Sequence, residues 1–320
     1  MSEDFVSLPP YKVALASAVQ SRGERVDWGL RAYGVPALWS KTKGEGVTVA
    51  VIDSGVANHP DLAHCVVDRR NFSGDDDAID TLGHGTHVAG VIAADGEMKG
   101  IAPSAKILSL KSVGHSGTGA LVRIAEAINF AVDAKADIAV MSLGSTKPSD
   151  AVHQAVIRAY EAGVILVCAA GNDGGKVRYP AAFRESIGVG AVNKRGEVCD
   201  FSARGKEVFV VAPGEDVTST WVNDGYATVS GTSMAAPFVA GVLALYASSI
   251  KKDGGAVTQG GARTAIERTC KDAGPAGRDD MYGWGLLDPH GLVNHRIDKD
   301  RKSTRLNSSH VSESRMPSSA

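Results

Sequence analysis

The chain has 320 residues, of which 43% are hydrophobic, enough for a sizeable core and too many for a disordered protein. Lysine and arginine number 34 and aspartate and glutamate 36, so the net charge is −2 and no basic excess points to nucleic-acid binding. No apolar run approaches the roughly 20 residues that cross a bilayer, so we predict no integral membrane protein.

The cysteines are too sparse for a disulfide scaffold and none forms a CxxC pair for zinc: they are Cys65, Cys168, Cys199 and Cys270. The N-terminus carries Glu3 and Asp4 where a secretory signal has lysine or arginine. We therefore predict a cytoplasmic protein with reduced thiols, and secretion is the alternative.

From Val47 onward, short β-branched runs alternate with helical patterns and are joined by glycine-rich turns. The expected strands are 47–52, 106–110, 137–141, 164–168, 187–192 and 207–211. The expected helices are 84–94, 120–134, 150–162 and 233–249. This order predicts an α/β fold with a largely parallel, doubly wound sheet flanked by helices, in a single catalytic domain with its chemistry at the carboxyl ends of the strands.

We divide the chain into three parts. Residues 1–20 form an N-terminal extension, 21–296 the folded domain, and 297–320 a polar tail without periodicity. The run Asp300–His310 is what a common sequencing-adapter read encodes in frame, so we interpret residues from about 300 onward as an artefact. An ordinary disordered tail is the alternative.

Three segments place reactive residue types at the ends of expected elements. Asp53 follows a buried strand, His84 begins the helix in Gly83–Gly90, and Ser233 begins another in Gly231–Pro237. A serine hydroxyl needs a base to become a nucleophile, histidine titrates in the right range, and a buried carboxylate holds the imidazole tautomer. Each residue alone could be a helix cap or turn residue. Their conjunction makes coincidence implausible.

The segments resemble the active-site signatures of subtilisin-like serine proteases, and the resemblance covers about residues 35–290. It implies a serine endopeptidase of broad specificity in which Asp53 orients, His84 is base and acid, and Ser233 attacks the peptide carbonyl to form an acyl-enzyme. Asn172, after an apolar strand, is similar to the family's oxyanion residue and would donate its side-chain amide.

The resemblance also implies a cleft where substrate adds as a strand. One rim would consist of Ser142, Leu143 and Gly144, and the other of Gly117, Thr118 and Gly119, whose small residues admit a peptide. Ala169 and Ala170 near the cleft favour apolar or large substrate side chains.

The N-terminal extension narrows the resemblance to the intracellular branch. Only 52 residues precede Asp53, too few for a signal and a folding pro-domain together. Leu8-Pro9-Pro10-Tyr11 resembles the motif of intracellular subtilisins, which carry a brief inhibitory extension and are often dimers. We predict that Leu8–Tyr11 lies across the cleft without presenting a cleavable bond; a plain Pro-Pro linker is the alternative. The expected partners are protein or peptide substrates, this N-terminal segment and a second copy in a homodimer.

No cofactor is expected for the chemistry. Asp61 matches a calcium ligand of the family, but only residues 95–99 stand where relatives have a longer calcium loop, so a structural calcium ion would rest on Asp61. Residues 75–77 are three aspartates, which we interpret as a solvated acidic turn. His87 and Phe238 are expected to pack structurally.

An α/β-hydrolase esterase is a second reading. It would use Ser233 with Asp288 and His290, but it requires Gly-x-Ser-x-Gly, and Ala235 stands at the second glycine. It also leaves His84 unexplained.

A non-catalytic module is a third reading. A metal site of His59, His84 and His87 lacks the i, i+4 spacing of helical zinc ligands. A protein that only binds peptides is disfavoured because Asp53, Ser233 and the other reactive groups are all present.

Overall fold

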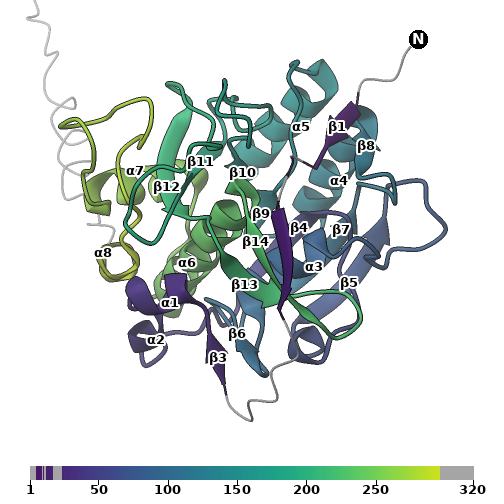
Figure 1. Ribbon diagram of the computed structural model, residues 1–320, viewed down its shortest axis with the longest axis horizontal. Coiled ribbons are helices and arrows are strands. Elements are labelled where there is room, and N and C mark those ends of the chain that lie inside the picture. Colours follow the sequence, from purple (N-terminus) through teal and green to yellow (C-terminus); the bar gives the residue numbers. More distant parts are fainter. Residues whose placement is uncertain (1–4, 9, 11, 17–23, 296–320) are drawn as a thin grey trace, which may run out of the picture.

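A seven-stranded parallel sheet forms the centre of this computed structural model, which describes residues 5–8, 10, 12–16 and 24–295 (Figure 1). In spatial order the strands are β12 (Val208–Pro213), β11 (Ile187–Val192), β10 (Ile165–Ala169), β9 (Ile138–Met141), β4 (Thr48–Asp53), β7 (Lys106–Lys111) and β5 (Val66–Asn71). All six pairings are parallel, which confirms the predicted fold class.

Helices cover both faces of the sheet because the strands are apolar on both sides. Val49 and Val51 of β4 belong to one core with α3 (His84–Ala93) and α6 (Thr232–Lys252). Ala50 and Ile52 belong to a second core with α4 (Leu121–Asp133) and α5 (Asp150–Glu161). The chain order reverses around β4, so the carboxyl ends of β4 and its neighbours lie at a topological switch point, where α/β proteins hold their ligands.

Helix α6 corrects one expectation from the sequence. It has 21 residues, and an 18-residue stretch of it has a mean hydropathy of 1.6, so by length and composition alone it could cross a membrane. It is buried without interruption from Thr232 to Ser248. Gly241 lies against Ile101, where a Cβ would approach the isoleucine Cβ to 2.8 Å. The helix is apolar because it is the central helix of the core.

The remaining elements are short or half exposed, and the sequence pattern did not indicate them. The helices are α1 (Trp28–Ala32), α2 (Val35–Leu38), η1 (Pro60–Leu62), α7 (Gln259–Thr269) and α8 (Pro289–Asn294). The strands are β3 (Arg25–Val26), which pairs with β6 (Met98–Lys99), and β13 (Val217–Thr220), which pairs with β14 (Tyr226–Ser230).

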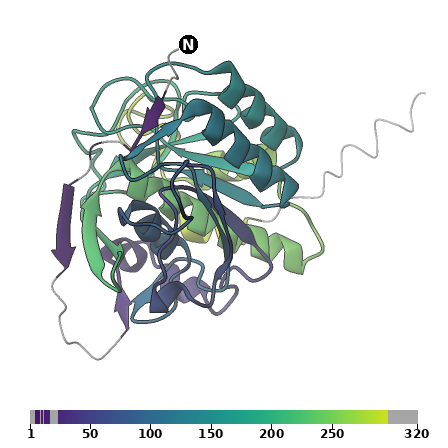
Figure 2. The same cartoon turned by 90° about the vertical axis from the view of Figure 1, so that its right-hand side faces the viewer.

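The N-terminal extension contributes two strands to the periphery (Figures 1 and 2). β1 (Phe5–Ser7) runs antiparallel to β8 (Thr118–Ala120), and β2 (Lys12–Ala16) runs antiparallel to β14. Pro9 and Tyr11, predicted to lie across the cleft, and residues 296–320, which include the predicted polar tail, lie outside the described residues. The four cysteines are free thiols.

Candidate active site

Asp53 and His84 form a buried pair at the carboxyl end of β4. His84 Nδ1 lies 2.8 Å from Asp53 Oδ1, and both side chains are fully buried. The same carboxylate oxygen accepts a hydrogen bond from the Ser54 backbone N–H at 2.7 Å. Because a carboxylate only accepts, the imidazole carries a proton on Nδ1, which makes Nε2 the basic nitrogen of the neutral ring.

The start of α3 is held by a carboxylate that the sequence analysis missed. Asp80 Oδ1 accepts from the Gly83 N–H at 3.0 Å, and Oδ2 accepts from the Thr86 N–H at 3.0 Å and hydroxyl at 2.7 Å. Ser54 Oγ accepts from the Gly85 N–H at 2.9 Å. Three residues separate Asp80 from His84, so it does not stand at the usual helix-start position and the local pattern does not mark it. These contacts fix the helix that carries His84.

Ser233 lies at the same edge of the sheet. Its hydroxyl donates to the Ser142 carbonyl at 3.3 Å, and the buried Ser142 hydroxyl donates back to the Ser233 carbonyl at 2.9 Å. Ile52 pairs with Met141, so Asp53 and Ser142 follow on neighbouring strands, about 4.8 Å apart by the usual strand spacing. The structure therefore brings the three motifs together.

Asn172 is oriented by the first turn of α6. Its Oδ1 accepts from the Thr232 N–H at 2.8 Å and the Thr232 hydroxyl at 2.7 Å. The amide nitrogen therefore points away from the helix, where it donates to the Pro10 carbonyl oxygen at 2.9 Å. A Cβ on Gly231 would lie 2.7 Å from this nitrogen, so glycine leaves the room that the amide needs.

Both expected rims contact the N-terminal segment. The Ser7 N–H donates to the Gly144 carbonyl at 3.2 Å, and the Gly144 N–H donates to the Ser7 carbonyl at 3.1 Å. The Leu8 N–H donates to the Gly117 carbonyl at 3.0 Å, and Thr118 and Gly119 pair with β1. A peptide strand therefore runs between the two rims, as the resemblance implied for a substrate.

A cavity of about 80 Å³ opens beside Asn172. Leu143, Gly144 and Ala169 line it, whereas Ala170 belongs to the core beneath. The sequence analysis missed two of its lining residues, Asp173 and Arg178, which form an ion pair. The loop residues Asp173 and Arg178 carry no local signal, because only the folding of their loop over the cavity gives them a role.

Arg178 narrows this cavity. A Cβ on Gly144 would lie 2.9 Å from the Arg178 Cβ, and a Cβ on Gly171 would lie 2.8 Å from its Cγ, so the arginine stem fills the space beside both glycines. Partial burial alone would raise the pKa of Asp173, but the hydrogen bond from Arg178 lowers it below its usual value. The cavity wall is therefore charged, although the neighbouring alanines had suggested an apolar one.

Asp61 does not fit a calcium site. Its Oδ1 accepts from the Glu97 N–H at 3.0 Å, and its Oδ2 accepts from the Met98 N–H at 2.8 Å and the Tyr226 hydroxyl at 2.9 Å. These partners are hydrogen-bond donors, whereas calcium requires further oxygen ligands. Within the described part of the chain, no three His, Cys, Asp or Glu residues could together hold a metal ion.

The histidines of the alternative metal site have separate partners. His59 Nε2 lies 3.1 Å from the Gly225 carbonyl, His84 bonds to Asp53, and His87 Nε2 lies 3.1 Å from the Val217 and Ala227 carbonyls.

The esterase alternative fails on position. Asp288 caps α8 through the backbone N–H of His290, and the His290 ring bonds to the Gly34 carbonyl at 3.0 Å, so neither residue joins Ser233.

The buried His87 should make the fold sensitive to acid. Burial, and secondarily the charge of His84, lower the pKa of His87 to about 3. The unfolded chain, with a histidine pKa of about 6.5, then binds one more proton between these values, so the unfolding free energy should fall by about 1.4 kcal/mol per pH unit below 6.5 from this group. His87→Gln should remove this contribution, so the unfolding free energy should depend less steeply on pH by about 1.4 kcal/mol per pH unit.

Urea unfolding of the parent chain, His87→Gln and a control variant between pH 4.5 and 7 checks this. His64→Gln, which alters an exposed histidine, is the matched control and should keep the slope. An unchanged slope in His87→Gln would refute the assignment.

Comparison with known proteins agrees with this geometry. A family model described as "Subtilase family" matches residues 44–285. The chain is 44% identical over 237 residues to the major intracellular serine protease of Bacillus subtilis (strain 168), covering 69% of this chain and 74% of that protein. It is 40% identical over 258 residues to the intracellular serine protease of Paenibacillus polymyxa, covering 76% and 78%.

An extracellular relative is similarly close. The minor extracellular protease Epr of Bacillus subtilis (strain 168) is 40% identical over 270 residues, which are 81% of this chain but 40% of that longer protein. The family match covers well over half of the chain and spans Asp53, His84, Asn172 and Ser233. The chain therefore belongs to the subtilase family and is a subtilisin-like serine endopeptidase.

Proposed function

We propose that the chain cleaves proteins through an acyl-enzyme formed on Ser233. The Ser233 oxygen attacks the peptide carbonyl carbon while its proton passes to His84 Nε2, and Asp53 stabilises the resulting imidazolium. The C–N bond then breaks as His84 returns the proton to the amine. A water molecule releases the acyl group by the same steps. The buried Asp53–His84 pair supports these roles.

The orientation of the Asn172 side-chain amide is the main observation behind this proposal. A tetrahedral intermediate needs donors already aimed at the position of its negative oxygen. The amide of Asn172 is held by Thr232 and donates to a backbone carbonyl, that of Pro10. We propose that a substrate carbonyl takes the place of the Pro10 carbonyl, with the Ser233 backbone N–H as the second donor.

We further propose that the N-terminal extension is an inhibitor. β1 occupies the path between the two rims, and Val6 is buried in the same core as Leu121. Proline has no N–H and a fixed φ, so Pro10 cannot extend the ladder that ends at Leu8. The segment then blocks the cleft, and its Pro10 carbonyl occupies the Asn172 amide in place of a substrate carbonyl. This proposal includes the division of the chain into an inhibitory extension, residues 1–20, and a peptidase domain, residues 21–296.

Displacing β1 should activate the full chain. Val6 is 1% exposed and its neighbour Phe5 is 54% exposed, so Val6→Asp places a charge in the core whereas Phe5→Asp places one in solvent. Losing the burial of one valine should weaken docking by roughly 10- to 100-fold. The initial rate on a tetrapeptide anilide should therefore rise in Val6→Asp, toward that of a chain lacking residues 1–20, and stay constant in Phe5→Asp.

Equal rates for the parent, Val6→Asp and the truncated chain would contradict inhibition and leave the extension as a linker.

The proposed location is the cytoplasm, supported by the two relatives named as intracellular and by the four free thiols. Fractionation of the source cells tests it, and activity in the medium alone would favour secretion.

A further inference from the structure

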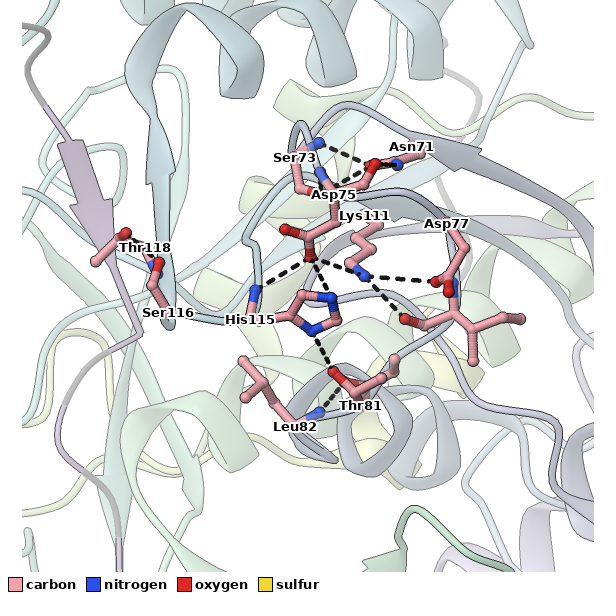
Figure 3. Close-up of polar contacts among 12 residues, drawn as sticks. Asn71, Ser73, Asp75, Asp77, Thr81, Leu82, Lys111, His115, Ser116 and Thr118 are labelled. Atoms are coloured by element: carbon pink, nitrogen blue, oxygen red, sulfur yellow. Dashed lines mark hydrogen bonds and ion pairs between the residues drawn. The ribbon is translucent and has the colours of Figure 1, made fainter.

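Lys111 is a buried cation with no part in the proposed chemistry. It is the last residue of β7 and 1% exposed, and no other lysine or arginine in the described residues is buried. Its ammonium donates to the Ile79 carbonyl at 3.0 Å and lies 3.0 Å from Asp75 Oδ2 and 3.7 Å from Asp77 Oδ1 (Figure 3). Burying a charge is costly unless it is paired, so this placement calls for a role. Two of the three aspartates, Asp75 and Asp77, therefore pair with a buried lysine, so the turn is more than a solvated acidic one.

Asp75 connects this ammonium to a substrate rim. The same Oδ2 that meets Lys111 accepts from the His115 N–H at 3.1 Å, and a Cβ on Gly114 would lie 2.8 Å from Oδ1. Partial burial alone would raise the pKa of Asp75, but its ion pair with Lys111 lowers it, so the carboxylate stays charged. Figure 3 shows Asp75 between the lysine and the His115 turn.

The turn at His115 leads directly into β8. The Gly114 N–H donates to the Thr118 carbonyl at 3.0 Å, and the Gly117 N–H donates to the Gly114 carbonyl at 2.9 Å, which closes the hairpin. A Cβ on Gly119 would lie 2.1 Å from the Ser112 carbonyl oxygen, so the hairpin strands approach closely. Asp75 therefore anchors the hairpin whose β8 edge pairs with β1.

The other end of the segment reaches the catalytic helix. Ile79, whose carbonyl binds Lys111, precedes Asp80, which holds the start of α3. In the sheet, Lys111 pairs with Asp53. Lys111 could therefore act on substrate binding through Asp75 or on the chemistry through Asp80. These two routes predict different kinetics.

We propose that Lys111 is a positioning residue for substrate binding: its ammonium holds Asp75 so that hairpin 112–120 presents the β8 edge to an incoming peptide strand. The route through Asp75 is favoured because Lys111 meets a carboxylate there, and hydrogen bonds between two charged groups are the stronger ones. Toward Asp80, Lys111 contacts only the Ile79 backbone carbonyl. This inference rests on the proposed function. A peptide that pairs with β8 depends on Lys111, and a substrate too short to reach β8 does not.

Lys111→Met in the full chain, with Val6→Asp to free the cleft, tests this with two substrates. One is a succinylated tetrapeptide anilide, and the other is an N-acetylated amino-acid ester with the same residue at the cleaved bond. The KM of the tetrapeptide should rise roughly tenfold, the equivalent of about one strand hydrogen bond, with kcat within about twofold. The kcat/KM of the ester should stay within about twofold.

Lys106→Met is the matched control, because this lysine lies at the opposite end of β7 with an exposed side chain. Lys106→Met should leave the KM and kcat of both substrates unchanged. Asp75→Asn keeps an acceptor for His115 but loses the charge, so it should reproduce the KM effect in part and carries the test if Lys111→Met does not fold.

Equal losses of kcat/KM on both substrates would overturn the inference, because they would show that Lys111 supports Asp53 and His84 rather than the β8 edge. An unchanged tetrapeptide KM in both Lys111→Met and Asp75→Asn would also overturn it. If the Val6→Asp chain, with Lys111 intact, hydrolyses neither substrate, the proposed function is wrong and the inference falls with it.

Discussion

Replacing Ser233 by alanine should abolish hydrolysis of denatured casein, with a loss in kcat of roughly 10⁶-fold, the size known for the nucleophile of subtilisin itself. The proposed mechanism gives no other oxygen at this position. Ser142 is the nearest serine hydroxyl in the hydrogen-bond network, but it is bound to the Ser233 carbonyl and buried. The residual rate should come from Asn172 and substrate binding alone.

Ser248→Ala is the matched control. Ser248 lies on the same helix, far from the cleft, where its hydroxyl donates to the Glu45 carbonyl at 2.8 Å. It should cost some stability and leave kcat unchanged. A sulfonyl fluoride should also label the parent at Ser233, as read by mass spectrometry of the digested protein. Undiminished casein hydrolysis by Ser233→Ala would refute the acyl-enzyme mechanism.

Asp53→Asn should lower kcat by about 10⁴-fold, as the equivalent change does in other serine proteases. Asp53 Oδ1 receives both the His84 Nδ1 bond and the Ser54 N–H. An amide at this position can turn its donor group toward the ring, which moves the histidine proton to Nε2 and removes the base. It also leaves the imidazolium without a counter-charge in a fully buried site.

Asp61→Asn is the matched control for Asp53→Asn, because Asp61 is also a buried carboxylate bonded to backbone N–H groups. It should lower the melting temperature without lowering kcat. The measurement is kcat on a tetrapeptide anilide at saturating concentration. A loss of kcat in Asp53→Asn no larger than that in Asp61→Asn would show that Asp53 does not orient the base.

The central strands and helices were predictable because each is a local pattern. β4 and β11 are short apolar runs, and their predicted bounds differ from the observed ones by at most one residue. β5 was missed because it is an edge strand that carries Asp68, Arg69 and Arg70. Local composition cannot distinguish such a strand from a loop, since its pairing with β7 supplies the order.

The chemistry-bearing motifs were also readable from the chain, because Asp53, His84 and Ser233 each stand at the end of an element with distinctive neighbours. Only the tertiary structure decided the partners of Lys111, the ion pair of Arg178 and the direction of the Asn172 amide toward Pro10. Each of these depends on loops that meet through the packing of separate elements. A sequence pattern records what adjacent residues favour, whereas the surroundings of a charge are set by whichever distant segments the fold brings beside it.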